Sequence, residues 1–198
     1  MTTKAVLGLQ LPTDPRWVDL AAMRLEDILT DHAYCEQKAA TTCISLIVSY
    51  PEQTELVQRL SPVVTEEWGH FRMVLEELRK RGLTLGRQRK DEYVNQLMPQ
   101  VRKGQGYEAQ LVDRLLVCAL IEARSCERFK LLSEQLDDEA LRAFYRSLMV
   151  SEAGHYRLFV DLAETVQDRE AVRTRWEALR EAEAGILAGL TPRGDRMH

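Results

Sequence analysis

Two short motifs of one kind are the strongest candidates for chemistry in this sequence. Glu67 and His70 form one Glu-x-x-His motif, and Glu152 and His155 form a second, each residue lying 85 positions after its counterpart. In an α helix this spacing puts a carboxylate and an imidazole on one face, where both can bind the same metal ion. The flanking residues also match, since E-W-G-H-F-R and E-A-G-H-Y-R share five positions or chemically similar ones. The pattern favours an internal duplication.

Two further glutamates complete the candidate set. Glu36 and Glu122 lie 86 positions apart, and each follows the apolar stripe of its own predicted helix. Burying several carboxylates together costs several kcal/mol for each unless cations neutralise them. Mixed carboxylate and imidazole ligation favours iron or manganese over zinc. We therefore expect two metal ions with six ligands: Glu36, Glu67, His70, Glu122, Glu152 and His155.

Other assignments stay open at this level. A single Glu-x-x-His arises by chance in many charged helices, and only the repeated, inward-facing pattern favours metal. Glu26 and Glu127 are alternative carboxylates, although they fit their apolar faces less well. Cys35 and Cys126 adjoin the proposed ligands or lie one turn away, but core packing accounts for the thiols more simply. The four cysteines form no C-x-x-C pair, so a disulfide framework or zinc knuckle is not indicated.

The elements that position these residues are helices. Asp14-Pro15 is typical of a helix start, Thr30 and Asp31 are candidate caps of a second segment, and Tyr50-Pro51 ends that segment. Gly82 and Asp138 mark another end and another start. Apolar residues at helical spacing predict helices over residues of about 17–29, 30–50, 52–81, 107–135, 138–166 and 168–190.

These helices predict an all-α protein. The chain has 198 residues, 45% of them hydrophobic, which suits a single domain over residues 1–198 with a core of about 15–190 and a flexible tail at 191–198. Short loops within two helix pairs and one long crossover, residues 82–110, indicate a ferritin-like four-helix bundle with additional flanking helices. The amino terminus resembles no targeting signal and no span is apolar enough for a membrane, so a soluble, cytoplasmic protein is expected.

Charge is uneven along the chain. The net charge is −4, yet residues 79–103 contain eight Lys or Arg and two Asp or Glu, a local charge of +6. A basic segment of this kind suits phosphate groups of a nucleic acid. The alternative is a solvated loop beside a helix end, where Arg79, Lys80 and Arg81 complement the helix dipole.

Several segments carry a family resemblance. D-H-A-Y-C-E-Q-K-A-A around Glu36, E-E-W-G-H-F around Glu67, R-G-L-T-L-G in the crossover, L-I-E-A-R-S-C-E-R-F around Glu122 and S-E-A-G-H-Y around Glu152 occur in this order. They resemble the signatures of the tRNA hydroxylases that act on 2-methylthio-N6-isopentenyladenosine beside the anticodon. E-A-R-S-C-E-R-F is the most discriminating, because other ferritin-like proteins share the Glu-x-x-His pairs.

The resemblance implies a monooxygenase. A centre of two iron ions held by the six ligands would use O2 to insert one oxygen atom into the isopentenyl group, with no catalytic residues beyond the ligands. Two electrons would come from an external donor, a small redox protein. The other partner would be a tRNA anticodon stem-loop, with phosphate contacts expected from Arg87, Arg89, Lys90, Arg102 and Lys103.

Two rival functions remain at the level of sequence. A ferritin- or rubrerythrin-like iron-oxidising protein needs the same ligands but no RNA substrate. Ferritins form cages, whereas we expect a monomer or small homo-oligomer. A metal-free interaction bundle is the second rival, and it leaves the six inward-facing polar residues without a physical reason.

Overall fold

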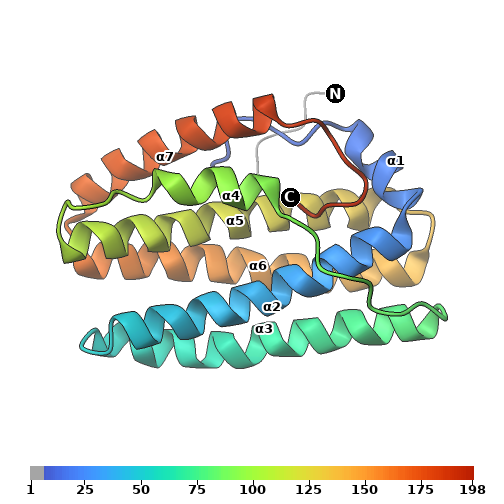
Figure 1. The fold of residues 1–198 in the computed structure, drawn as a ribbon, viewed down its shortest axis with the longest axis horizontal. Helices are drawn as coiled ribbons and strands as arrows, with labels where there is room; N and C mark the ends of the chain where they lie inside the picture. The colour runs from blue at the N-terminus through green and yellow to red at the C-terminus, as the bar shows by residue number, and fades with distance from the viewer. Residues whose placement is uncertain (1–6) are drawn as a thin grey trace. The chain divides into compact units, whose positions relative to one another are not determined.

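The computed structural model describes residues 7–198, and the described chain is helical with no strand, as Figure 1 shows. The all-α prediction is confirmed. Residues 1–6, part of the segment expected to lack a targeting signal, lie outside the described residues. None of the described helices is both long and apolar enough to span a bilayer. The elements are α1 (Arg16–Ala22), α2 (Leu25–Ser49), α3 (Thr54–Lys80), α4 (Glu92–Leu97), a 3-10 turn η1 (Met98–Gln100), α5 (Tyr107–Gln135), α6 (Glu139–Val166) and α7 (Arg169–Gly189).

The residues group into two compact units, each built around one helix pair. The α2–α3 unit comprises residues 19–90 and 193–197, and the α5–α6 unit comprises residues up to 18, residues 91–192 and His198. The boundary therefore falls within α1 and again just before α4. The expectation of a single domain stays a prediction.

The α2–α3 unit is a helical hairpin, with its two long helices side by side. The helix α3 ends in a Schellman motif, in which Gly82 donates to the carbonyl of Arg79 at 3.0 Å and Leu83 donates to that of Leu78 at 3.0 Å. Gly82 has a φ of +68°, which a residue with a side chain rarely adopts. The glycine therefore fixes where α3 ends.

One predicted helix boundary in this unit is wrong. Thr30 and Asp31 do not cap a new segment, because α2 runs without interruption from Leu25 to Ser49. Both side chains are buried and have tertiary partners: the Thr30 hydroxyl accepts from the Gly86 amide at 3.3 Å, and the Asp31 carboxylate accepts from the Met197 amide at 2.7 Å. The Thr30 and Asp31 side chains are therefore hydrogen-bonded to distant residues and do not cap a helix.

The α5–α6 unit holds a second hairpin, on which α7 packs against α5 and α4 packs against α7. Asp138 and Asp168 cap α6 and α7, each accepting a backbone N–H three residues later at 3.0 Å. Asp91 caps α4 in the same way. The apolar residues of α6 follow one face, and the following side chains on that face are buried: Leu141, Tyr145, Leu148, Phe159 and Leu162.

A buried ionic network fastens α7 and the amino-terminal segment to α5 in this unit. Arg124 is fully buried and donates to the Glu183 carboxylate at 2.7 Å and to the Leu11 carbonyl at 2.9 Å. It also pairs with Glu127, which accepts from the Thr13 hydroxyl at 2.6 Å. Each of these buried charges therefore has a partner of opposite sign, as burial requires.

The carboxyl-terminal residues 191–198, for which the sequence predicts a flexible tail, have several buried contacts. Met197 is fully buried in the α2–α3 unit, and Asp195 pairs there with Arg193 at 3.0 Å. His198 belongs to the α5–α6 unit, where its Nε2 lies 2.9 Å from the Ser125 hydroxyl. The polar composition of the segment gave no sign of these contacts.

Gly194 marks the tightest approach in this segment. A Cβ atom added there would lie 2.0 Å from the carbonyl oxygen of Leu20, far inside van der Waals contact. We expect Gly194→Ala to lower the free energy of unfolding by about 1 to 3 kcal/mol or more, measured by urea denaturation. Gly185→Ala is the control, because no atom lies within 4 Å and helix propensity predicts a gain of about 0.5–1 kcal/mol. Equal stability of the two variants would contradict the close packing.

Candidate metal centre

The α2–α3 unit brings three of the predicted ligands together. Glu36 comes from α2, and Glu67 and His70 come from α3, where their spacing of three places both on the buried face. One ligand atom from each residue lies within 4.8 Å of the others. The exposed fractions are 4%, 1% and 7%, so the three groups are almost completely removed from water. We call this group the α2–α3 half-site.

The electrostatics of this half-site are strongly perturbed. Burial alone would lower the pKa of His70, but hydrogen bonds to Glu36 and Glu67 outweigh it and raise the pKa to about 10. His70 Nδ1 lies 3.2 Å from Glu67 Oε2 and 3.6 Å from Glu36 Oε2. Burial would likewise raise the pKa of Glu36, but contacts with His32 and His70 hold it well below its usual range. The two carboxylates thus attract a positive charge to this position.

His32 is a site residue that sequence reasoning missed. It is fully buried on α2, and its Nε2 lies 2.6 Å from Glu36 Oε1. Because the pKa of Glu36 is held low, its carboxylate is the acceptor in this contact, and the Nε2–H tautomer of His32 is the one that donates to it. The spacing of four residues on one helix face was the available signal. His32 fixes the orientation of a proposed ligand.

The α5–α6 unit repeats the arrangement with the other three predicted ligands. Glu122 comes from α5, and Glu152 and His155 come from α6. Their ligand atoms also lie within 4.8 Å of one another, and their exposed fractions are 5%, 3% and 4%. This α5–α6 half-site has the same composition as the first: one glutamate from one helix and a Glu-x-x-His pair from its neighbour.

The donor set fits a divalent transition metal. Each half-site offers two carboxylates and one imidazole, and one divalent cation would balance the two negative charges that burial makes costly. Oxygen and nitrogen donors without thiolate suit iron or manganese. Neither half-site includes a cysteine, and burial raises the pKa of Cys118 to about 12 and that of Cys126 to about 11. Without a metal ion, those two thiols are therefore protonated near neutral pH.

Glu127, one of the alternative carboxylates, has a different role in the structure. Its oxygens accept hydrogen bonds from the amide and hydroxyl of Thr13 and pair with Arg124. The side chain is therefore part of the buried ionic network of α5. Glu26 likewise belongs to neither half-site.

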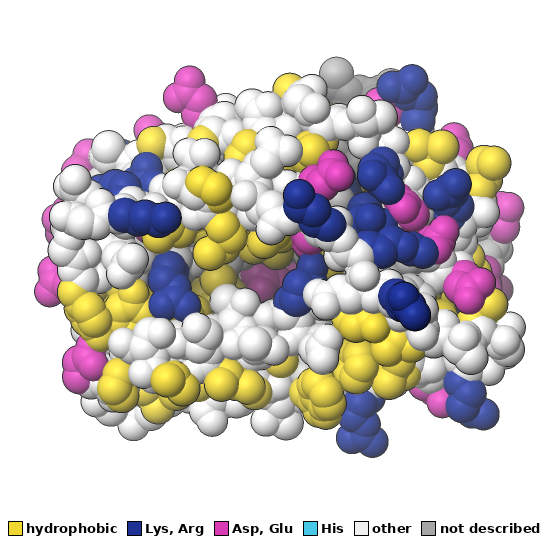
Figure 2. All heavy atoms as spheres, viewed as in Figure 1, with side chains coloured by type: hydrophobic (Ala, Val, Ile, Leu, Met, Phe, Trp, Pro, Cys, Tyr) yellow, Lys and Arg dark blue, Asp and Glu magenta, His cyan; other side chains and the backbone are white. Residues whose placement is uncertain are grey.

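The five residues expected to contact RNA differ in exposure and in ion pairing. Arg87, Lys90 and Lys103 are exposed. Arg89 pairs with Asp27, and Arg102 pairs with Asp113 at 2.8 Å. Figure 2 shows Lys and Arg side chains interspersed with Asp and Glu side chains on one face of the molecule. Formal charge along the sequence therefore overstates the free positive charge on the surface.

Comparisons relate this chain to known proteins. A family model described as tRNA-(MS[2]IO[6]A)-hydroxylase (MiaE) matches residues 1–198. A protein of Pseudomonas putida named tRNA 2-(methylsulfanyl)-N(6)-isopentenyladenosine(37) hydroxylase is 38% identical, over 90% of this chain and 86% of its own length. A protein of Salmonella typhimurium with the same name is 28% identical, over 90% of this chain and 83% of its own.

A solved structure is similar as well. It is described as protein 43 with aldehyde deformylating oxygenase activity from Synechococcus, and it is 38% identical to this chain. The TM-score is 0.90, with 96% of this chain and 94% of that chain covered. The prediction of a ferritin-like fold is confirmed.

Proposed function

Because the chain belongs to the tRNA-(MS[2]IO[6]A)-hydroxylase (MiaE) family, we propose that it hydroxylates the isopentenyl group of 2-methylthio-N6-isopentenyladenosine beside the anticodon of tRNA. The observation that carries the proposal is the pair of matching half-sites, one on each helix hairpin, in a chain that the family model covers from end to end. A tRNA substrate would place the reaction in the cytoplasm.

Each half-site is proposed to hold one iron ion, which gives the two irons of a di-iron enzyme. Bound iron would supply the O2 chemistry that inserts one oxygen atom into a C–H bond of the substrate. Glu36, Glu67 and His70 would hold one ion, and the ligands of the other would be Glu122, Glu152 and His155. The second oxygen atom leaves as water, which requires two electrons and two protons. We propose a small redox protein as the electron donor.

The fold keeps the six proposed ligands away from water and holds them in fixed orientations. All six side chains lie on long helices rather than loops, so packing of the hairpins fixes their positions. The His32 Nε2 proton holds the Glu36 carboxylate in one orientation. Exclusion of water prevents side reactions and strengthens the attraction between the carboxylates and a cation.

His32→Ala is expected to weaken iron binding about 10- to 100-fold, because Glu36 loses the donor that orients it. The measurement is an Fe(II) titration in competition with a chelator of known affinity. His32→Gln keeps an N–H donor on a side chain of similar reach and should recover part of the affinity. Unchanged iron affinity in His32→Ala would show that the contact with Glu36 does not serve the metal.

The exposed cations of the basic segment are proposed to contact RNA phosphates. We expect the double variant Arg87→Glu, Lys90→Glu to weaken binding of an anticodon stem-loop and to lower the salt dependence of log Kd by about 0.7–0.9 for each phosphate that the variant no longer binds. Arg89 and Arg102 are proposed as weaker contributors, because carboxylates already share their charge. If the double variant binds the stem-loop with the same affinity and salt slope as the unmodified protein, the basic segment is only solvated and does not bind RNA.

The decisive experiment uses tRNA that carries the isopentenyl and methylthio groups. It is incubated with iron-loaded protein, a chemical reductant and O2, and its nucleosides are then measured by mass spectrometry. A gain of one oxygen atom on the modified adenosine, absent with Glu67→Ala, is the expected result. No gain from a protein that holds two irons would reject the tRNA substrate.

A second candidate function is O2-dependent deformylation of an aldehyde. The observation in its favour is the similar solved structure with aldehyde deformylating oxygenase activity. Release of the formyl carbon from an added aldehyde, without oxygen transfer to tRNA, would favour this function. Iron oxidation without either reaction would favour the ferritin-type rival.

A further inference from the structure

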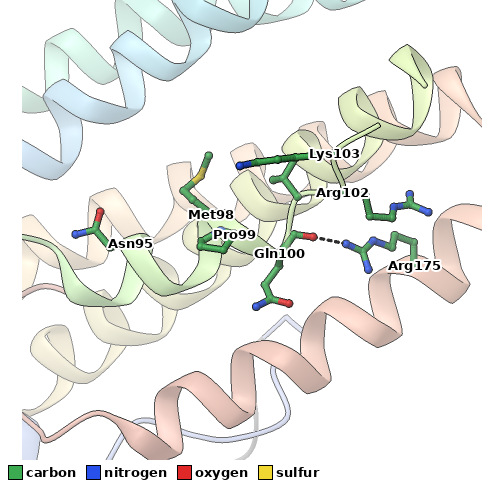
Figure 3. A pocket seen from close by; sticks show the side chains of 8 residues that line it. Asn95, Met98, Pro99, Gln100, Arg102, Lys103 and Arg175 are labelled. Carbon is green, nitrogen blue, oxygen red and sulfur yellow. Dashed lines mark hydrogen bonds between the residues drawn. The ribbon is translucent and has the colours of Figure 1, made fainter. Parts of the chain in front are cut away.

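A groove in the α5–α6 unit lies apart from the metal half-site of that unit. It has a volume of about 710 Å³ and is bordered by α4, η1, the segment that follows η1, and α7. Figure 3 shows the side chains at its edge, with Arg175 of α7 donating to the Gln100 carbonyl at 2.5 Å. This hydrogen bond joins α7 to the end of η1 and gives the groove a fixed wall. Neither Glu122, Glu152 nor His155 lines it.

The groove has an excess of positive charge. Arg102 and Arg175 both pair with Asp113 at 2.8 Å, so two guanidinium groups share one fully buried carboxylate. Lys103 is exposed and has no ion-pair partner among residues 7–198. These three cations and one carboxylate leave a net charge of +2, and no acidic side chain of the described residues lines the groove. Such a surface attracts an anion.

The rest of the lining is apolar or carries amide groups. Met98 is 46% exposed and adjoins the exposed Pro99, so together they form an apolar shelf. Asn95 and Gln100 add side-chain amides, which can donate to and accept from the edge of a base. An inorganic anion would use only the cations. A nucleotide would use all three kinds of surface, since it combines a phosphate, hydrogen-bonding edges and a flat ring.

We propose that this groove binds one unpaired nucleotide of the RNA substrate, with its phosphate at Lys103 and its ribose or base on the Met98–Pro99 shelf. The volume falls in the range of about 300–1,000 Å³ that is usual for small-molecule sites. The inference rests on the proposed function, because the nucleotide belongs to the same tRNA. The proposal gives Met98, Asn95 and Gln100 a role in binding the nucleotide, which the charge of the groove alone does not indicate.

The test measures binding of an anticodon stem-loop RNA by fluorescence anisotropy at salt concentrations of about 50–200 mM. Lys103→Gln is expected to raise Kd several-fold and to lower the salt slope of log Kd by about 0.7–0.9, the value for one phosphate contact. Met98→Ala is expected to raise Kd with the slope unchanged, because it removes an apolar contact only. Both residues are exposed, so both variants should fold.

Arg146→Gln is the matched control, since it removes one exposed positive charge from α6 without touching the groove. If Lys103→Gln and Met98→Ala bind like this control, the groove assignment is wrong while the proposed function stands. If the original chain binds no stem-loop at all, the RNA substrate and the groove assignment both fail. If adenosine monophosphate binds as tightly as the stem-loop and Lys103→Gln weakens both equally, the groove serves a free nucleotide and the RNA assignment is overturned.

Discussion

Glu122→Gln is expected to abolish tRNA hydroxylation and yet to stabilise the metal-free chain. Glu122 and Glu152 are almost fully buried, and their ligand atoms lie within 4.8 Å of each other. Without a metal ion, only the nearby His155 offsets the repulsion between the two carboxylates, and a neutral amide of the same shape removes that repulsion. The free energy of unfolding of the metal-free variant should rise by roughly 1 to 2 kcal/mol. The same change removes an anionic ligand, so iron content and oxygen transfer should both fall to background.

The two effects are measured separately. Urea denaturation in the presence of a chelator gives the stability of the metal-free chain, and metal analysis after iron loading gives the stoichiometry. Glu134→Gln is the matched control, because it makes the same chemical change at an exposed position of α5. A variant that kept two irons, or was less stable without metal, would remove Glu122 from the proposed ligand set.

Arg124→Ala is expected to have the largest effect on stability. Arg124 is fully buried between Glu183 and Glu127, so its removal leaves two buried carboxylates without their cation. Loss of one partner from such a buried group costs about 3–5 kcal/mol. The Leu11 carbonyl would also lose its donor, and the amino-terminal segment should detach more readily. Urea denaturation measures the loss.

The cost should come from unpaired charge rather than from missing volume. The triple variant Arg124→Met, Glu127→Leu, Glu183→Leu replaces the three charged side chains by apolar ones and is expected to recover part of the stability that Arg124→Ala removes. The recovery is partial because the Thr13 hydroxyl, the Tyr93 hydroxyl and the Leu11 carbonyl lose their partners. Arg146→Ala, at an exposed position, should stay within about 0.5 kcal/mol of the original chain. If the triple variant were less stable than Arg124→Ala, packing would outweigh electrostatics at this position.

The local sequence determined most of the helices and the faces that they bury. Glu67, His70, Glu152 and His155 interrupt apolar stripes, and this interruption was enough to predict that they point inward. Asp138, Asp168 and Gly82 marked helix ends because caps and left-handed turns depend on neighbouring residues. The pairing of each Glu-x-x-His motif with one glutamate of an adjacent helix followed from the repeat spacing, while metal binding by these groups stays a prediction.

Only the tertiary structure decided which polar groups are already paired. Thr30 and Asp31 resemble a cap in sequence, but their partners, Gly86 and Met197, are 56 and 166 residues away. The sequence gives no sign that Arg89 pairs with Asp27 of α2. The role of His32 likewise depends on its buried contact with Glu36. Composition and helical periodicity report local preference and burial. The partner of a charge or hydrogen-bonding group depends on contacts between distant residues, and those form only when the chain folds.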